Sequence, residues 1–202
     1  MKYMGTRIMN EPAEIEVIKL FTDILDELNI PYAIGGSIAS SVYGRVRFTQ
    51  DADITVTLLD DKAEQFYNSI REHFYISKSA MHQAVRGKTS FNVIHTQTAF
   101  KIDVFVAQDN EFDNNLIQRA QKIKLSEDIE KTFSVVTAED IILLKLMWYK
   151  QTDCSSEKQW SDLLGVLTGR RDALDFDYIK SWSKKLQVDV LLTRAMKESE
   201  IS

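Results

Sequence analysis

The sequence predicts an α+β protein, in which a mixed β-sheet with flanking helices over residues 1–135 is followed by a helical region, residues 136–202, packed on it. Two patterns predict this class. Short segments of the first part alternate apolar and polar residues or are rich in β-branched and aromatic side chains, as strands are, whereas the second part repeats apolar residues at helical steps. The chain has 202 residues, 44% of them hydrophobic. This length suits one medium domain with a helical appendage better than two large domains.

The first part begins with two helix and strand pairs. Pro12 suits the first turn of a helix, and Pro31 disfavours helix at the residue before it. The elements expected between and after these prolines are, in order, a helix over residues 15–28, a short buried strand in "YAIGG" (32–36), a helix in "SIASSVYG" (37–44) and a strand in "DADITVTL" (51–58).

The remaining elements follow the same logic. We expect a helix over about residues 61–73 and then a hairpin, because two β-rich runs are separated by the polar Gln97 and Thr98. Thr137 and Asp140 resemble a capping box at the start of the helical region. The runs are "TSFNVIHT" (89–96) and "AFKIDVFVA" (99–107), and the helical segments cover residues 137–150, 155–169, 175–186 and 189–199.

Composition limits where the protein works and what it binds. The N-terminus lacks the apolar core of a signal peptide and no window is apolar enough to span a membrane, so we expect a cytoplasmic protein. The single cysteine, Cys154, excludes an internal disulfide and fits a reducing compartment. A formal net charge of −5 means that binding to nucleic acid would need a local basic patch.

A glycine turn joins the first short strand to the helix after it. Gly35, Gly36 and Ser37 place unblocked backbone N–H groups and a hydroxyl at a helix N-terminus. Such a terminus carries a partial positive charge and free donors, and glycine lets a ligand approach the main chain. The turn therefore predicts a seat for phosphate.

Three aspartates predict a metal centre. Asp51 and Asp53 lie two residues apart on a strand, so their carboxylates project from the same face and need a cation. Oxygen ligands of this kind suit Mg²⁺, which keeps coordination positions for substrate phosphates. Asp103, in the apolar strand "KIDVF", is the natural third ligand. Together the three predict two-metal chemistry for phosphoryl or nucleotidyl transfer.

The stretch "GGSIASSVYGRVRFTQDADI", residues 35–54, resembles the signature of the nucleotidyltransferase superfamily, which has a polymerase-β-like fold. It is most similar to the AbiEii-type toxin and minimal nucleotidyltransferase groups. Weaker similarity continues in "VVTAEDIILLKL" and "SEKQWSDLLGVL", so the resemblance covers about residues 14–168. It implies a nucleotidyltransferase-like mixed sheet with flanking helices.

The resemblance implies roles for the residues that match the signature. Gly36 and Ser37 become the triphosphate-binding turn, and Asp51 and Asp53 become ligands of the catalytic metals. Asp103 becomes the third carboxylate, which helps to bind metal and activates the acceptor hydroxyl.

The resemblance also extends to residues outside that core. Arg47 matches a basic position that neutralises phosphate charge. Lys145, whose place in an apolar run calls for an acidic or phosphate partner, and Asp162 match later motifs. Ser156 and Gln159 depart from the pattern, since AbiEii-like proteins tend to have Arg and Asp there.

These observations predict a Mg²⁺-dependent enzyme, with Mn²⁺ as a substitute, that moves a nucleoside monophosphate from an NTP to a hydroxyl of a protein, RNA or small molecule. A toxin–antitoxin or phage-defence system, with a cognate antitoxin or regulator as partner, is the expected setting. Two alternatives stay open. One is a non-catalytic nucleotide-binding or antitoxin-like recognition module, and the other is an aminoglycoside-type nucleotidyltransferase with the same core.

Overall fold

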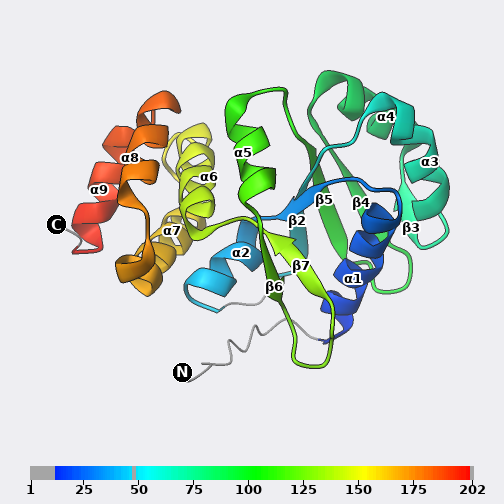
Figure 1. Cartoon of the computed structure of the whole chain (residues 1–202), viewed down its shortest axis with the longest axis horizontal. Helices are drawn as coiled ribbons and strands as arrows, with labels where there is room; N and C mark the ends of the chain where they lie inside the picture. The colour runs from blue at the N-terminus through cyan, green and yellow to red at the C-terminus, as the bar shows by residue number, and fades with distance from the viewer. Residues whose placement is uncertain (1–11, 47–48, 201–202) are drawn as a thin grey trace.

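The computed structural model describes residues 12–46 and 49–200, and these form a β-sheet with helices on both sides and at one end (Figure 1). The sheet has seven strands in the order β3-β4-β5-β2-β1-β7-β6. In chain order the strands are Tyr32–Ile34 (β1), Asp51–Val56 (β2), Phe74–Ile76 (β3), Ser90–His95 (β4), Lys101–Val106 (β5), Gln121–Lys124 (β6) and Thr132–Val135 (β7).

Helices surround this sheet and form the C-terminal third of the chain. They are Pro12–Glu27 (α1), Gly36–Tyr43 (α2), Asp60–Ile70 (α3), Lys78–Gly87 (α4), Glu111–Arg119 (α5), Ala138–Gln151 (α6), Glu157–Arg170 (α7), Phe176–Lys185 (α8) and Asp189–Glu198 (α9), with a 3₁₀ turn at Arg171–Ala173 (η1). In the described ranges, no helix has the length and apolar character needed to cross a membrane.

The sheet is mixed, and its centre is a parallel pair. Strands β2 and β5 run parallel, with Asp53 opposite Asp103 and Asp51 opposite Lys101. Strand β1 is antiparallel to β2 and parallel to β7, while the two outer pairs, β3 with β4 and β6 with β7, are antiparallel. The β4–β5 pair is the expected hairpin, and the register of β2 with β5 places the three predicted carboxylates on adjacent strands.

One face of the sheet is packed with apolar side chains beneath α1, α3 and α4. The alternate residues 52, 54 and 56 of β2 and 102, 104 and 106 of β5 are buried. Phe21 of α1 meets Phe66 of α3 and Phe74 of β3 edge-on, with ring centroids 6.2 and 5.8 Å apart. The opposite residues of β2 and β5 are only half-buried, so the polar residues of both strands point away from this core.

The helical region shares its core with the sheet. Buried residues of α6 and α7 belong to the same hydrophobic cluster as those of β1 and β2. Thr137 caps α6 by accepting from the N–H of Asp140, as the sequence predicted. Strand β7 ends at Val135 and α6 begins at Ala138, but a division into two units at residue 135 stays a prediction.

Several short elements were not expected from the sequence. The strand β6, Gln121–Lys124, is almost wholly exposed, so it has no apolar alternation to mark it. Strand β3 has three residues, with Tyr75 exposed between two buried neighbours. Strand β7 and helices α4 and α5 complete the set of elements that the sequence analysis did not predict.

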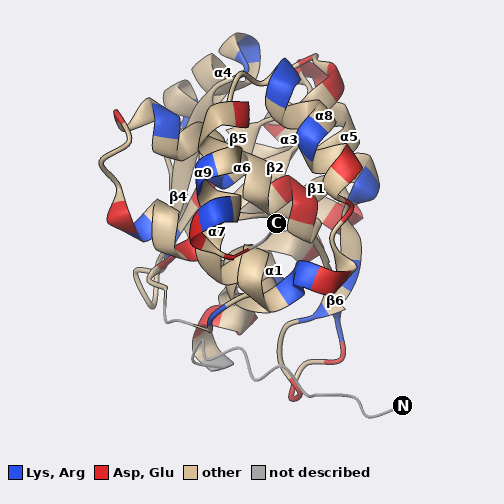
Figure 2. Ribbon diagram, turned by 90° about the vertical axis from the view of Figure 1, so that its left-hand side faces the viewer, with Lys and Arg blue, Asp and Glu red and all other residues tan. Residues whose placement is uncertain are grey.

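Charges of both signs are interspersed over the described ribbon. In Figure 2, segments with Lys or Arg lie next to segments with Asp or Glu along the helices and loops. This mixture agrees with the small formal net charge of −5. The electrostatics of any site are therefore set by its immediate neighbours.

Candidate functional site

The glycine turn packs against one of the predicted carboxylates. The N–H of Gly35 donates to the carbonyl oxygen of Asp53 at 2.8 Å, which fixes the end of β1 against β2. Gly36, the first residue of α2, has φ +54°, and a Cβ on it would overlap the Asp53 carboxylate. Glycine is required there for both reasons. Ser37 follows, buried in the first turn of α2.

Four charged side chains form a compact group on the half-buried face of β2 and β5. They are Asp51, Asp53, Lys101 and Asp103, and we call them the charge cluster. The parallel register places Asp51 beside Lys101 and Asp53 beside Asp103. Neighbouring strands are about 4.8 Å apart and residues two apart share a face, so each side chain has two of the others as close neighbours.

Lys101 is the cation of this cluster. Its Nζ donates to Asp103 Oδ2 at 2.6 Å and lies 3.9 Å from Asp51 Oδ2. The hydroxyl of Thr49 donates to Asp51 Oδ1 at 2.9 Å, which orients that carboxylate. These side chains are partly open to solvent, with 39% of Lys101, 35% of Asp51 and 26% of Asp103 exposed.

Asp53 is the most perturbed acid of the group. Burial and then the charge of Asp51 raise its pKa to about 6, while Lys145 acts in the opposite direction. The hydrogen bond from Lys101 to Asp103 raises the pKa of Lys101 and keeps it protonated. A carboxylate with a raised pKa in a polar site gains from a further positive charge nearby, which a cation or a substrate-bound cation would bring.

A second lysine reaches the site from the helical region. Lys145 on α6 donates to Asp162 Oδ2 on α7 at 2.9 Å, and both side chains are buried, with 1% and 9% exposed. Its charge lowers the pKa of Asp53, so the two groups interact electrostatically. The side chain of Leu144 lies beside Gly35, which brings α6 against the glycine turn.

The structure therefore gathers most of the residues that the sequence singled out. Gly35, Gly36 and Asp53 are in contact, Asp51 and Asp103 lie on the same sheet face, and Lys145 approaches from α6. Arg47 lies outside the described residues. Lys101 and Thr49 were missed as site residues, although the spacing Lys101-x-Asp103 on a strand is a signal that could have found the lysine.

The charge cluster fits a hard divalent cation by its donor type. Asp51, Asp53 and Asp103 supply the oxygen ligands that Mg²⁺ prefers. In the conformation of residues 12–46 and 49–200, however, no three His, Cys, Asp or Glu side chains are arranged to hold a metal ion. The ammonium of Lys101 lies against two of these carboxylates. The donor atoms thus fit a metal by their chemistry, but the three carboxylates would have to turn toward one another, and Lys101 away from them, to hold one.

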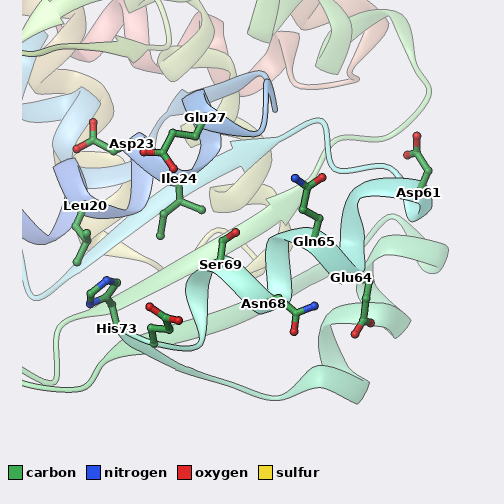
Figure 3. A pocket seen from close by; sticks show the side chains of 11 residues that line it. Leu20, Asp23, Ile24, Glu27, Asp61, Glu64, Gln65, Asn68, Ser69 and His73 are labelled. Carbon is green, nitrogen blue, oxygen red and sulfur yellow. The ribbon is translucent and has the colours of Figure 1, made fainter.

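A groove elsewhere on the molecule has the wrong charge for a phosphate ligand. It has a volume of about 900 Å³, lies between α1 and α3, and contains no residue of the charge cluster (Figure 3). Asp23, Glu27, Asp61, Glu64 and Glu72 are among its lining residues. Its described lining residues include no lysine, arginine or glycine to offset these carboxylates, whereas the charge cluster lies beside the glycine turn and two lysines.

The sequence matches no protein-family model and no curated protein, but the structure matches solved structures. An antigenic nucleotidyltransferase-like protein from Paracoccidioides brasiliensis has a TM-score of 0.53 at 19% identity, covering 91% of each chain. ANT(2″)-Ia in complex with adenylyl-2″-tobramycin has a TM-score of 0.56 at 15% identity, covering 87% of this chain and 97% of that one. A Thermotoga maritima protein provisionally assigned as a nucleotidyltransferase scores 0.51 at 13% identity, covering 78% and 98%.

The chain has a nucleotidyltransferase-like fold. The fold class predicted from the sequence is thereby confirmed, as is the wider likeness to nucleotidyltransferase-like proteins. At identities below 20% the likeness is one of fold, and it transfers no substrate. The AbiEii-type assignment stays a prediction.

Proposed function

We propose that the protein is a metal-dependent nucleotidyltransferase, which moves a nucleoside monophosphate from an NTP to a hydroxyl acceptor and releases pyrophosphate. The observation that carries this proposal is the charge cluster packed against the glycine turn of α2. Three carboxylates lie on adjacent parallel strands, and Gly36 brings a helix N-terminus against Asp53. This combination offers cation ligands and phosphate-binding N–H groups side by side.

Each part of the site has a role in this proposal. Asp51, Asp53 and Asp103 would hold Mg²⁺ or Mn²⁺, which when bound neutralises phosphate charge and polarises the phosphorus under attack. The Gly35 N–H is already bonded to the Asp53 carbonyl oxygen, so we assign the triphosphate oxygens to the N–H groups of Gly36 and Ser37 and the Ser37 hydroxyl, at the start of α2. Lys145, held by Asp162, adds positive potential on the helical side.

The reaction forms one bond and breaks one bond. The acceptor oxygen attacks the α-phosphorus, and the bond from that phosphorus to the oxygen leading to the β-phosphate breaks. Pyrophosphate leaves with that oxygen, while the hydroxyl proton passes to a carboxylate. Asp103 is the carboxylate that we assign to this step, because it is partly exposed on the open sheet face and can meet an acceptor.

The acceptor is a protein, an RNA or a small molecule. The fold shared with ANT(2″)-Ia supports including aminoglycosides among the small molecules to be tried. The resemblance of residues 35–54 supports a toxin–antitoxin or phage-defence role with a cognate antitoxin or regulator. An exposed free thiol at Cys154 supports a cytoplasmic setting.

Labelled nucleotides test the proposal. The protein is incubated with α-³²P-labelled NTPs, Mg²⁺ or Mn²⁺, and an acceptor panel of cell RNA, lysate protein and aminoglycosides. We expect transfer of label to one acceptor, and we expect no transfer from γ-labelled NTP because the γ-phosphate leaves with pyrophosphate. Asp53→Asn should remove at least about 99% of the transfer, and adding Asp51→Asn should cost little more, because ligands of one centre act as a unit.

Two results would contradict the enzyme. If no acceptor takes up α-label although NTP binds, the chain is a nucleotide-binding recognition module. Label transferred from the γ-position would instead indicate a kinase. Growth arrest on expression that depends on Asp51 and Asp53, and that a neighbouring gene product relieves, would support the toxin–antitoxin role separately.

A further inference from the structure

Lys101 has an unusual position for a lysine on an exposed strand face. It lies two residues before Asp103 on β5 and directly opposite Asp51 on β2, so three strand positions fix its neighbours. Its ammonium is 2.6 Å from one carboxylate and 3.9 Å from the other. The lysine is thus held between two carboxylates of the cluster, those of Asp51 and Asp103.

The charges explain why a cation is needed there. Three carboxylates on two adjacent strands repel one another. This repulsion is why the charges of Asp51 and Asp103 both raise the pKa of Asp53. Among the described residues, Lys101 is the lysine in ion-pair contact with Asp51 and Asp103. A divalent cation bound by the same oxygens would compete with the ammonium for them.

We propose that Lys101 is a built-in counter-ion that occupies the cation position of the charge cluster, and that a divalent cation must displace its ammonium in order to bind. This inference rests on the proposed function, since it concerns the same metal centre. Displacement is feasible because the Lys101 side chain is 39% exposed and has four rotatable bonds. The lysine weakens the binding of free divalent cation.

The proposal is tested with Mn²⁺ alone, without nucleotide, on the full chain. Free Mn²⁺ is measured by electron paramagnetic resonance during titration of the wild type and of Lys101→Gln. Removal of the competing ammonium should tighten Mn²⁺ binding roughly tenfold, the size expected when one partly exposed ion pair and one weaker contact no longer have to be broken. Lys101→Arg keeps the charge and should bind Mn²⁺ within about threefold of the wild type.

Two controls locate the effect. Lys131 bridges Asp23 and Asp26 with both Nζ–Oδ distances at 2.6 Å, so Lys131→Gln removes a lysine from two carboxylates away from the cluster, of which Asp23 keeps its ion pair with Lys19. It should change Mn²⁺ affinity less than about twofold, because two carboxylates form a poorer site than three. Adding Asp53→Asn to Lys101→Gln should abolish the gain, which shows that Mn²⁺ binds at the cluster. Circular dichroism of each variant verifies folding.

The outcomes separate this inference from the proposed function. Equal or weaker Mn²⁺ binding by folded Lys101→Gln overturns the counter-ion role, even if label transfer succeeds. Tighter binding supports it, even if no acceptor is ever labelled. If Lys101→Gln fails to fold, Lys101→Met is measured in its place with the same criterion. Absence of Mn²⁺ binding in every variant overturns both this inference and the metal centre.

Discussion

Two lysine–aspartate pairs near the candidate site lie in opposite environments, and the difference shows how each is used. Lys101 contacts Asp103 on the open sheet face with 39% of its side chain exposed, whereas Lys145 contacts Asp162 between α6 and α7 with 1% exposed. Water screens the first pair and can replace either partner, whereas the lysine of the second pair is almost wholly shielded from it. The Lys101–Asp103 ion pair can therefore be broken when a ligand binds, whereas the Lys145–Asp162 ion pair stabilises the packing of α6 on α7.

The same contrast extends to the two regions. The face of β2 and β5 that carries the charge cluster keeps polar groups half-exposed, so its charges can respond to a ligand. The helical region buries its lysine under apolar residues of α6 and α7, so that its position is fixed. The candidate site thus combines one lysine that burial holds in place with partly exposed charged side chains that can change position.

The largest effect should follow from breaking the buried pair. Lys145→Met leaves the Asp162 charge buried without its lysine, and this should lower the free energy of unfolding by about 3–5 kcal/mol. Urea denaturation measures the loss. The double variant Lys145→Met with Asp162→Leu should recover most of it, because the Asp162 charge is then removed together with its lysine. A loss below about 1 kcal/mol in the single variant would show that the Lys145–Asp162 pair does not stabilise the fold.

The glycine turn gives the next effect. Gly36→Ala should destabilise the protein by about 2–4 kcal/mol, because φ +54° disfavours a side chain and the Cβ would overlap the Asp53 carboxylate. Gly87→Ala is the matched control, since a Cβ there meets only the Thr89 side chain at 3.7 Å. It should be neutral or stabilise by up to about 1 kcal/mol. Equal thermal stability of both variants would contradict the assigned contact.

The raised pKa of Asp53 predicts a pH dependence. The pKa of about 6 in the folded protein exceeds the ordinary aspartate pKa of 3.8, so the folded state binds more protons between these two values and loses stability as pH rises through them. Without metal, unfolding free energy of the wild type relative to Asp53→Asn should fall by about 2–3 kcal/mol from pH 4 to pH 7. Urea titrations in chelator at four pH values measure it. A constant difference would mean that Asp53 has an ordinary pKa.

Much of this site could be predicted from the sequence because its signals are local. The strand at Asp51–Val56 alternates, so Asp51 and Asp53 had to share a face, and the glycine pair announced the turn before α2. That Asp103 belongs with Asp51 and Asp53 could be predicted only because it is a lone acid with apolar residues on both sides of it in its strand and would need a partner across the sheet.

The rest depended on contacts between distant residues. No local pattern says that Gly36 touches Asp53 or that Lys101 lies opposite Asp51, since β2 and β5 are about fifty residues apart and their register is set by packing of the buried face. The resemblance matched Lys145 and Asp162 to later motifs, but only the structure shows that they are partners. The edge strand β6 was not predicted from the sequence because almost none of its side chains is buried, so it has no apolar alternation.

The smallest expected change in stability is that of Lys101→Gln. In metal-free protein at neutral pH, Lys101→Gln should change the free energy of unfolding by less than about 1 kcal/mol, because both of its partners are more than a quarter exposed. The loss of unfolding free energy in Lys101→Gln should be at most about one third of the loss in Lys145→Met, measured by the same urea denaturation. A loss as large as that of Lys145→Met would mean that Lys101 is a structural clamp, and then a metal could not displace it without unfolding the strand pair. A small loss together with tighter Mn²⁺ binding is the combination that only a displaceable counter-ion produces.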